Sequence, residues 1–131
     1  GSPPRFVAMP KSLDECLRHY TALERLAEDE WYVCARCGSR QPTTKQLLLS
    51  TLPRVLCLHL KRFSWAKGSR AKVRTHVRFP LHGLDMAPFT VAGTAGGEAL
   101  YDLASVIVHH GPSVGSGHYS AYASASPGPR S

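Results

Sequence analysis

The sequence has no hydrophobic run long enough to cross a membrane. Its longer apolar stretches, such as Leu47–Leu49 and Val55–Leu58, fall far short of the roughly 20 consecutive residues that a transmembrane helix needs. The start of the sequence also lacks the charged and apolar regions of a signal peptide, and Gly1-Ser2 is typical of the remnant of a cleaved affinity tag. We therefore expect no membrane insertion, and we assign residues 1–11 to a tag remnant and linker.

The middle of the sequence lacks acidic residues. The 131 residues include 16 Lys and Arg but only 9 Asp and Glu, which gives a formal net charge of +7 at pH 7. No acidic residue occurs between Trp31 and Leu84. The basic residues of that stretch are Arg36, Arg40, Lys45, Arg54, Lys61, Arg62, Lys67, Arg70, Lys72, Arg74 and Arg78. This bias predicts an acidic partner, either nucleic acid, an acidic protein surface or another part of the same protein; a solubilising basic surface is the alternative.

Cysteine is scarce, and two of the 4 cysteines are closely spaced. Cys34 and Cys37 form a Cys-x2-Cys pair, which is the spacing of two ligands of a tetrahedral zinc ion. This use of cysteine favours a reducing intracellular compartment, nuclear or cytoplasmic. Cys16 and His19, on one face of a predicted helix, are candidates for the other two ligands, but Cys16 also fits the role of a small buried hydrophobic residue. Cys57 lies in an apolar run and is predicted to pack in the core.

The hydrophobic patterns predict one domain of the α+β class. Ser12-Leu-Asp-Glu15 is a capping box, in which the Ser12 hydroxyl accepts a hydrogen bond from an amide of the first turn and Glu15 reaches back to the Ser12 amide. We expect the helix to end near Thr21. An exposed loop is predicted at 66–72 and a flexible connection at 90–98. The β-prone runs are residues 31–33, 43–50, 55–63, 73–79, 101–109 and 118–123, with 104–108 as a core strand and the last two runs as a hairpin.

His118 directly follows a loop that contains three glycines, Gly111-Pro-Ser-Val-Gly-Ser-Gly117. A histidine at the start of a strand can be held rigidly at the edge of a cleft, where it acts as a general base if a nucleophile and an orienting group are near. A purely structural histidine is the alternative. His109 and His110 face opposite ways on a strand, so at most one of them reaches the His118 site.

Several segments resemble the ubiquitin-specific proteases in order and spacing. They are Pro53-Arg-Val-Leu-Cys-Leu-His-Leu-Lys-Arg-Phe63, Val77-Arg-Phe-Pro-Leu-His-Gly-Leu-Asp-Met86 and Tyr101-Asp-Leu-Ala, followed by His110-Gly and Gly117-His-Tyr-Ser-Ala-Tyr122. The resemblance covers roughly residues 13–123 and is closest to members that remove ubiquitin from histones. It implies a papain-like thiol protease with a β-rich palm and a zinc-bearing fingers region that grips ubiquitin.

The resemblance also implies roles for single residues. His118 corresponds to the general base of the family's Cys-His-Asp/Asn triad, and by family position His110, and not His109, is the histidine that reaches its site. Tyr119 and the loop from His110 to Gly117 would line the channel for the C-terminal tail of ubiquitin. Cys34 and Cys37 would be half of a structural zinc site. The implied activity is removal of ubiquitin from protein substrates, with ubiquitin, ubiquitinated proteins, and histones or the nucleosome as the expected partners.

The sequence departs from the family pattern at the other two triad positions. No Gly-Asn-Thr-Cys-Phe/Tyr box occurs, and no Asn-Asp-Ser-type segment follows Tyr122. We therefore expect residues 12–123 to be the C-terminal portion of the catalytic domain, inactive alone, with a flexible tail at 124–131. The alternative is a non-catalytic ubiquitin- or zinc-binding module. Direct nucleic-acid binding stays open, although the basic stretch lacks the aromatic spacing of a stacking platform.

Overall fold

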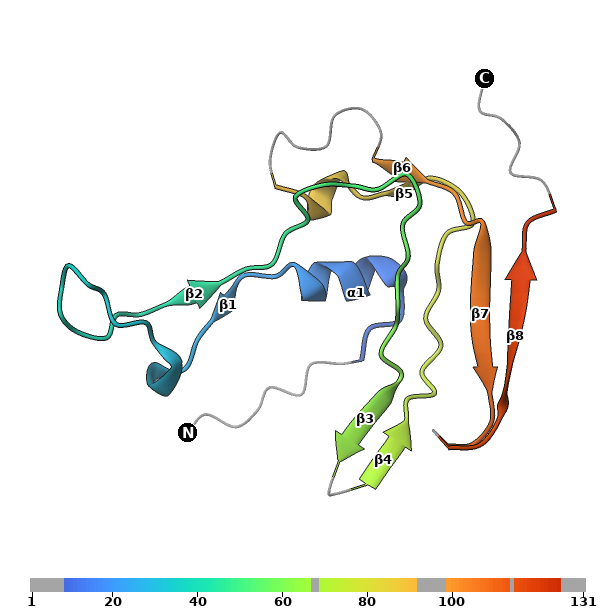
Figure 1. Cartoon of the computed structure of the whole chain (residues 1–131), viewed down its shortest axis with the longest axis horizontal. Coiled ribbons are helices and arrows are strands. Elements are labelled where there is room, and N and C mark those ends of the chain that lie inside the picture. Colours follow the sequence, from blue (N-terminus) through green and yellow to red (C-terminus); the bar gives the residue numbers. More distant parts are fainter. Residues whose placement is uncertain (1–8, 67–68, 92–98, 114, 126–131) are drawn as a thin grey trace.

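The computed structural model of the chain describes residues 9–66, 69–91, 99–113 and 115–125. Helix α1 lies near the middle, with the strand pairs arranged around it (Figure 1), and this mixture of helix and sheet confirms the predicted α+β class. The elements are, in chain order, α1 (Leu13–Tyr20), β1 (Glu24–Arg25), the 3-10 helix η1 (Glu28–Glu30), β2 (Thr44–Lys45), β3 (Phe63–Ala66), β4 (Ser69–Lys72), β5 (Leu84–Asp85), the 3-10 helix η2 (Ala87–Phe89), β6 (Leu100–Tyr101), β7 (Ser105–His110) and β8 (His118–Ala123).

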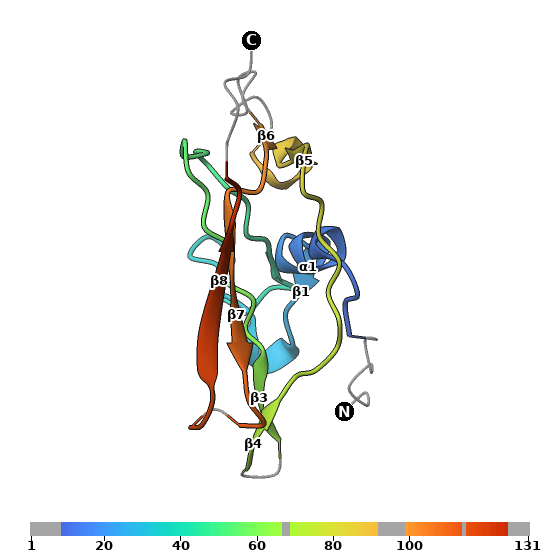
Figure 2. The same cartoon turned by 90° about the vertical axis from the view of Figure 1, so that its right-hand side faces the viewer.

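Each sheet in the described part of the chain is a two-stranded antiparallel pair. The pairs are β1–β2, β3–β4, β5–β6 and β7–β8. Turning the molecule by 90° brings the β7–β8 hairpin to the front, with β3–β4 beside its lower end (Figure 2). Among these described segments, no helix has the length and apolar character needed to span a membrane.

Helix α1 begins where the capping box predicts. The Ser12 hydroxyl accepts a hydrogen bond from the Glu15 amide at 3.2 Å, and the helix ends one residue before Thr21. The predicted return bond is wrong by one residue, because Glu15 Oε2 accepts from the Lys11 amide at 2.7 Å instead of the Ser12 amide. Arg78 forms a parallel bridge with Ser12 next to this cap: its amide donates to the Lys11 carbonyl at 2.9 Å, and its carbonyl accepts from the Leu13 amide at 2.8 Å.

The core is small and lies between α1 and η2. Leu17, Met86 and Phe89 form the buried cluster, and Met86 is 0% exposed. The partly buried residues packed against this cluster are Leu13, Leu49, Leu52, Leu56, Leu84 and Tyr101. The core therefore joins the helix to the η2 segment and to one side of the 49–56 run.

Several predicted strands are wrong because they lack a neighbour to pair with. Of residues 43–50 only Thr44–Lys45 form a strand, and of residues 55–63 only Phe63 does; 73–79 contains no strand. Val55 is 83% exposed and Cys57 is exposed as well, so neither packs in the core. A strand needs a hydrogen-bonding partner beside it, and the described residues provide none along most of these runs.

The segment predicted as a loop at 66–72 is instead part of the β3–β4 hairpin. Its register pairs Phe63 with Lys72 and Ala66 with Ser69. Hydrogen bonding continues past the ladder, because the Val73 amide donates to the Arg62 carbonyl at 2.7 Å. The sequence places a lysine and a glycine between the two strands, and glycine in a two-residue connection is a hairpin signal that the prediction missed.

The β7–β8 hairpin confirms the last predicted strand pair, with corrections at its start. Residues 101–109 do not form one strand: Leu100–Tyr101 belong to β6, and β7 begins at Ser105. The expectation of a buried core strand at 104–108 is also wrong, because Ile107 is 71% exposed. The apolar pattern is that of a covered strand, but the described residues do not cover this face. Most of the predicted connection at 90–98 and of the tail at 124–131 lies outside the described residues.

We predict that Ser12→Ala destabilises the chain by about 1 kcal/mol, because it removes the hydroxyl that accepts from the Glu15 amide. Urea unfolding followed by circular dichroism measures the change. Ser50→Ala, at an exposed position, is the matched control and should leave the midpoint unchanged. Equal midpoints for the two variants would contradict the capping role of Ser12.

Candidate functional site

His118 is the first residue of β8 and stands opposite His110, the last residue of β7. Because directly paired residues project from the same face of a hairpin, their side chains are neighbours. The two imidazole rings are stacked, with centroids 4.8 Å apart and planes inclined by 15°. The structure therefore places His110, and not His109, beside His118, while the His118 side chain stays exposed at the end of the hairpin.

The loop between the two histidines is closed by glycines that approach backbone atoms closely. Gly111 and Gly117 have φ angles of 139° and 144°. A Cβ atom on Gly117 would collide with the His110 carbonyl oxygen and lie 2.7 Å from His109 Nε2; on Gly111 it would collide with the Ser116 carbonyl oxygen. Only glycine fits both positions without movement of the backbone. This close approach sets where the chain re-enters the ladder, and therefore where His118 begins β8.

Tyr119, which the sequence places next to the candidate base, lies on the other face of the hairpin. It pairs with His109, and their ring centroids are 4.8 Å apart. Phe63 of β3 contacts the same imidazole edge-on, with a centroid distance of 6.1 Å. Tyr119 remains 71% exposed. The structure thus separates the predicted site residues into His110 and His118 on one face and Tyr119 on the opposite face.

Two residues near the histidines were missed by sequence reasoning. Ser120 Oγ lies 2.7 Å from His110 Nε2, within hydrogen-bonding distance. The alternation of a strand was the available signal, because Ser120 is two residues after His118 and shares its face. Lys72 of β4 is the second, and its Nζ donates to the carbonyl oxygens of His109 at 3.0 Å and Gly111 at 2.9 Å. No local signal exists for Lys72, because it lies far from the histidines in sequence.

The electrostatics around His109 favour its neutral form. Partial burial is the largest cause of its lowered pKa, followed by the ammonium of Lys72 and by the imidazoles of His110 and His118. Lys72 Nζ is 3.3 Å from His109 Nδ1, so a neutral ring can present an acceptor to it. The ammonium of Lys72, which binds the carbonyls at the start of the loop, therefore also disfavours protonation of His109.

Cys34 and Cys37 lie on a tight turn. Val33 and Arg40 form a bridge at its base, the Cys34 amide donates to the Ser39 carbonyl at 3.0 Å, and Gly38 donates to the Cys34 carbonyl at 2.8 Å. Val33 makes only this bridge, so the predicted strand 31–33 is wrong. Hydrogen bonds from the backbone and thiol of Cys37, and from the backbone of Arg36, lower the pKa of Cys34. A turn that stabilises a thiolate fits the requirements of a two-ligand zinc knuckle.

The alternative ligand set with Cys16 and His19 is wrong. No group of three or more potential metal ligands is found among the described residues, so these two side chains do not join Cys34 and Cys37. Cys16 is half-buried on α1, whereas His19 is exposed near the end of the helix. The turn therefore brings two cysteines together, and the described residues place no third potential ligand beside them.

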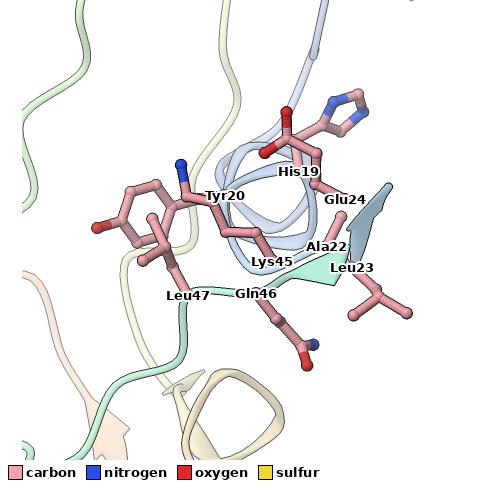
Figure 3. Close-up of a pocket in the computed structure, with 8 residues that line it drawn as sticks. All are labelled: His19, Tyr20, Ala22, Leu23, Glu24, Lys45, Gln46 and Leu47. Carbon is pink, nitrogen blue, oxygen red and sulfur yellow. The ribbon is translucent and has the colours of Figure 1, made fainter. Parts of the chain in front are cut away.

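A shallow hollow of about 420 Å³ lies between the end of α1 and the β1–β2 pair, and neither His110 nor His118 lines it. Its lining residues are His19, Tyr20, Ala22, Leu23, Glu24, Lys45, Gln46 and Leu47 (Figure 3). Gln46 closes one side, because its amide donates to the Thr21 carbonyl at 3.0 Å. The side chains in Figure 3 diverge instead of converging on a common point, so the hollow does not assemble a catalytic group.

One α+β chain thus carries an exposed histidine at the end of a glycine-closed hairpin and a turn with two cysteines. Comparison with known families makes the class specific. The family model for ubiquitin carboxyl-terminal hydrolase (UCH) matches residues 11–128. The chain belongs to this family.

Relatives and solved structures agree with the family. The chain is 54% identical over 114 residues to human (Homo sapiens) ubiquitin carboxyl-terminal hydrolase 3, covering 86% of this chain and 22% of that protein. It is 39% identical over 113 residues to Arabidopsis thaliana ubiquitin carboxyl-terminal hydrolase 5, covering 86% of this chain and 12% of that protein. The chain thus spans less than a quarter of the length of these relatives.

Two structures of the SAGA DUB module, which contains Ubp8, Sgf11, Sus1 and Sgf73, share the fold. The one bound to ubiquitin aldehyde has a TM-score of 0.78 at 34% identity, covering 93% of this chain and 28% of that chain. The one bound to monoubiquitin has a TM-score of 0.78 at 36% identity, covering 93% of this chain and 27% of that chain.

We predict that Gly117→Ala opens the hairpin loop and destabilises the chain by more than about 1 kcal/mol, because its Cβ collides with the His110 carbonyl at a positive φ. Amide hydrogen exchange should accelerate at residues 115–118. Gly115→Ala is the matched control, since open space surrounds that position, and it should leave exchange unchanged. Slow exchange in the Gly117 variant would show that the close approach does not hold the loop.

Proposed function

We propose that this chain is the base-bearing part of a thiol-dependent deubiquitinase, with His118 as its general base. The observation that carries the proposal is the glycine-closed hairpin, which holds an exposed His118 in a chain of the UCH family. The reaction is hydrolysis of the isopeptide bond after the terminal glycine of ubiquitin. Because the chain spans a minor part of its relatives, the nucleophilic thiol is assigned to a segment outside these 131 residues.

The proposed mechanism uses His118 in both directions of proton transfer. Its neutral imidazole takes the proton of the thiol, and the thiolate attacks the carbonyl carbon of the ubiquitin terminus. The imidazolium then gives that proton to the departing lysine amine, which leaves a thioester. A water molecule then gives a proton to the same imidazole and attacks the thioester, the C–S bond breaks to release ubiquitin, and the imidazolium returns the proton to the departing thiolate. His118 has to come within hydrogen-bonding distance of the thiol. Gly117, directly before it, has no side chain that would obstruct this approach.

The loop and its flanking residues are proposed to contact the C-terminal tail of ubiquitin. His110 stacks on His118 and would line the same side of the tail, while Gly117 offers backbone without a side chain. Tyr119 flanks His118 in β8 and is exposed on the opposite face of the hairpin, from which it is proposed to line another wall of the same channel. The related SAGA DUB module structures, bound to ubiquitin aldehyde and to monoubiquitin, support ubiquitin as the partner.

Histones or the nucleosome are the proposed carriers of the ubiquitin. The charge of the chain supports this choice: the stretch between Trp31 and Leu84 has no acidic residue, and Arg54, Arg74 and Arg78 on it are exposed. A basic surface of this kind attracts DNA or an acidic protein patch. The 4 cysteines are all free thiols, which supports an intracellular location, nuclear or cytoplasmic.

We predict that His118→Ala, in a full-length protein that contains this chain, lowers kcat by about 1,000-fold or more, as expected when a triad member is removed. Cleavage of a fluorogenic amide at the ubiquitin C-terminus provides the measurement. His76→Ala, at an exposed position outside the hairpin, is the control and should leave kcat unchanged. If the His118 variant retained its turnover, the chain would instead be a non-catalytic ubiquitin-binding module.

Zinc is proposed as a structural ion held in part by Cys34 and Cys37. Their turn fits two thiolate ligands, since its hydrogen bonds favour the charged form of Cys34. The other two ligands would come from outside the described residues. Such an ion would fix the knuckle without taking part in hydrolysis.

We predict that Cys34→Ser lowers the zinc content of the full-length protein by about one ion per molecule and loosens the knuckle, because a tetrahedral site loses much of its affinity with one thiolate. Mass spectrometry of the metal content tests this. Cys57→Ser, an exposed cysteine away from the knuckle, is the control and should keep its zinc. An unchanged ratio of zinc to protein in the Cys34 variant would contradict the proposal that Cys34 binds zinc.

A further inference from the structure

Lys72 connects two hairpins that are separate in sequence. It is the last residue of β4, and its half-buried side chain reaches the point where β7 ends. Its Nζ donates to the His109 carbonyl at 3.0 Å and the Gly111 carbonyl at 2.9 Å, and it lies 3.3 Å from His109 Nδ1. Figures 1 and 2 both show the end of β4 next to the loop end of β7.

The two carbonyls that Lys72 binds flank the exit from the β7 ladder. Backbone carbonyls that leave a ladder lose their regular partners, and a cation that bridges two of them restores hydrogen bonding and fixes their relative orientation. Gly111 is one of the two glycines on which loop closure depends, because its Cα position faces the Ser116 carbonyl. Fixing the Gly111 carbonyl therefore fixes the distance between the outgoing and returning arms of the loop.

A second contact ties the same two hairpins together. Phe63 is the register partner of Lys72 in β3–β4, and its ring contacts His109 with a centroid distance of 6.1 Å. The paired ends of β3 and β4 thus hold His109 with one aromatic contact and one cation. His109 in turn lies next to the Gly117 Cα, where a Cβ atom would be 2.7 Å from its Nε2.

We propose that Lys72 is a positioning residue for His118, acting through the carbonyls of His109 and Gly111 at the base of the loop. This inference rests on the proposed role of His118 as the general base. Lys72 does not touch the reacting atoms; it sets the point at which the loop returns to β8. Loss of its ammonium frees the loop exit, so His118 samples positions outside reach of the thiol.

The test uses the full-length protein with Lys72→Met, Lys72→Arg and, as a matched control, Lys45→Met on the exposed side of β2. We expect Lys72→Met to lower kcat by about 10- to 100-fold, the scale of a small misplacement of a catalytic group, with KM within about twofold. Lys72→Arg keeps a cationic donor and should stay within about threefold of wild type, and the control should match wild type.

Two readouts do not depend on turnover. Amide exchange at residues 115–118 should accelerate in Lys72→Met and stay slow in Lys72→Arg. The pKa of His109, measured by NMR, should rise in Lys72→Met, because the cation that disfavours its protonation is gone. A lysine that merely stabilised the fold from elsewhere would leave this pKa unchanged.

The outcomes separate this inference from the proposed function. If His118→Ala retained turnover while Lys72→Met still loosened the loop and raised the His109 pKa, the proposed base would be wrong and the Lys72 contact would stand. Unchanged exchange and an unchanged His109 pKa in Lys72→Met would overturn the positioning role. If Lys72→Met strongly lowered the melting temperature, the kcat of Lys72→Arg would decide whether Lys72 is a positioning residue. A kcat close to wild type in Lys72→Arg would support the role, and a kcat as low as that of Lys72→Met would overturn it.

Discussion

The close approach of two backbone segments at the end of β7–β8 is the constraint on which the histidine site depends. Gly111 and Gly117 lie where side chains would collide with carbonyl oxygens, so the loop closes only with hydrogen at these two Cα atoms. Closure in this register makes His110 and His118 direct partners and stacks their rings. A shift of the register by one residue would move His118 to the opposite face. The geometry of the site is therefore a consequence of backbone packing in the loop.

Charge contributes a second constraint at the same place. Lys72 is drawn to the loop by two carbonyls, and its ammonium lies close to His109. A protonated His109 would be repelled by this cation, which is one cause of its lowered pKa. Neutral His109 can instead accept from Lys72 and pack against Phe63 and Tyr119. The cation that contacts the loop thus adds to the effect of burial in lowering the pKa of His109.

Local sequence signals predicted the elements whose partners are near in sequence. The Ser12 cap and the β7–β8 hairpin belong to this group. Alternation showed only that one of His109 and His110 could share the face of His118, and the choice of His110 came from the family resemblance. The run around Val55 was predicted as buried because its pattern is apolar, yet exposure depends on which segments lie beside it. Lys72 could not have been found, because its three contacts are made across two separate hairpins. The periodicity of apolar residues along the sequence does not show which distant segments will lie beside one another.

The rigidity of the histidine site does not depend on the hydrophobic core. The cluster of Leu17, Met86 and Phe89 lies between α1 and η2, whereas the histidines are at the loop end of β7–β8 (Figure 1). Glycine packing, ring stacking and the Lys72 hydrogen bonds order the loop end through contacts within the two hairpins. A base ordered in this way is in position before a nucleophile approaches, so less conformational entropy is lost when the two groups meet. Under the proposed function, this separation would let the thiol that meets His118 come from a part of the polypeptide that is distant in sequence.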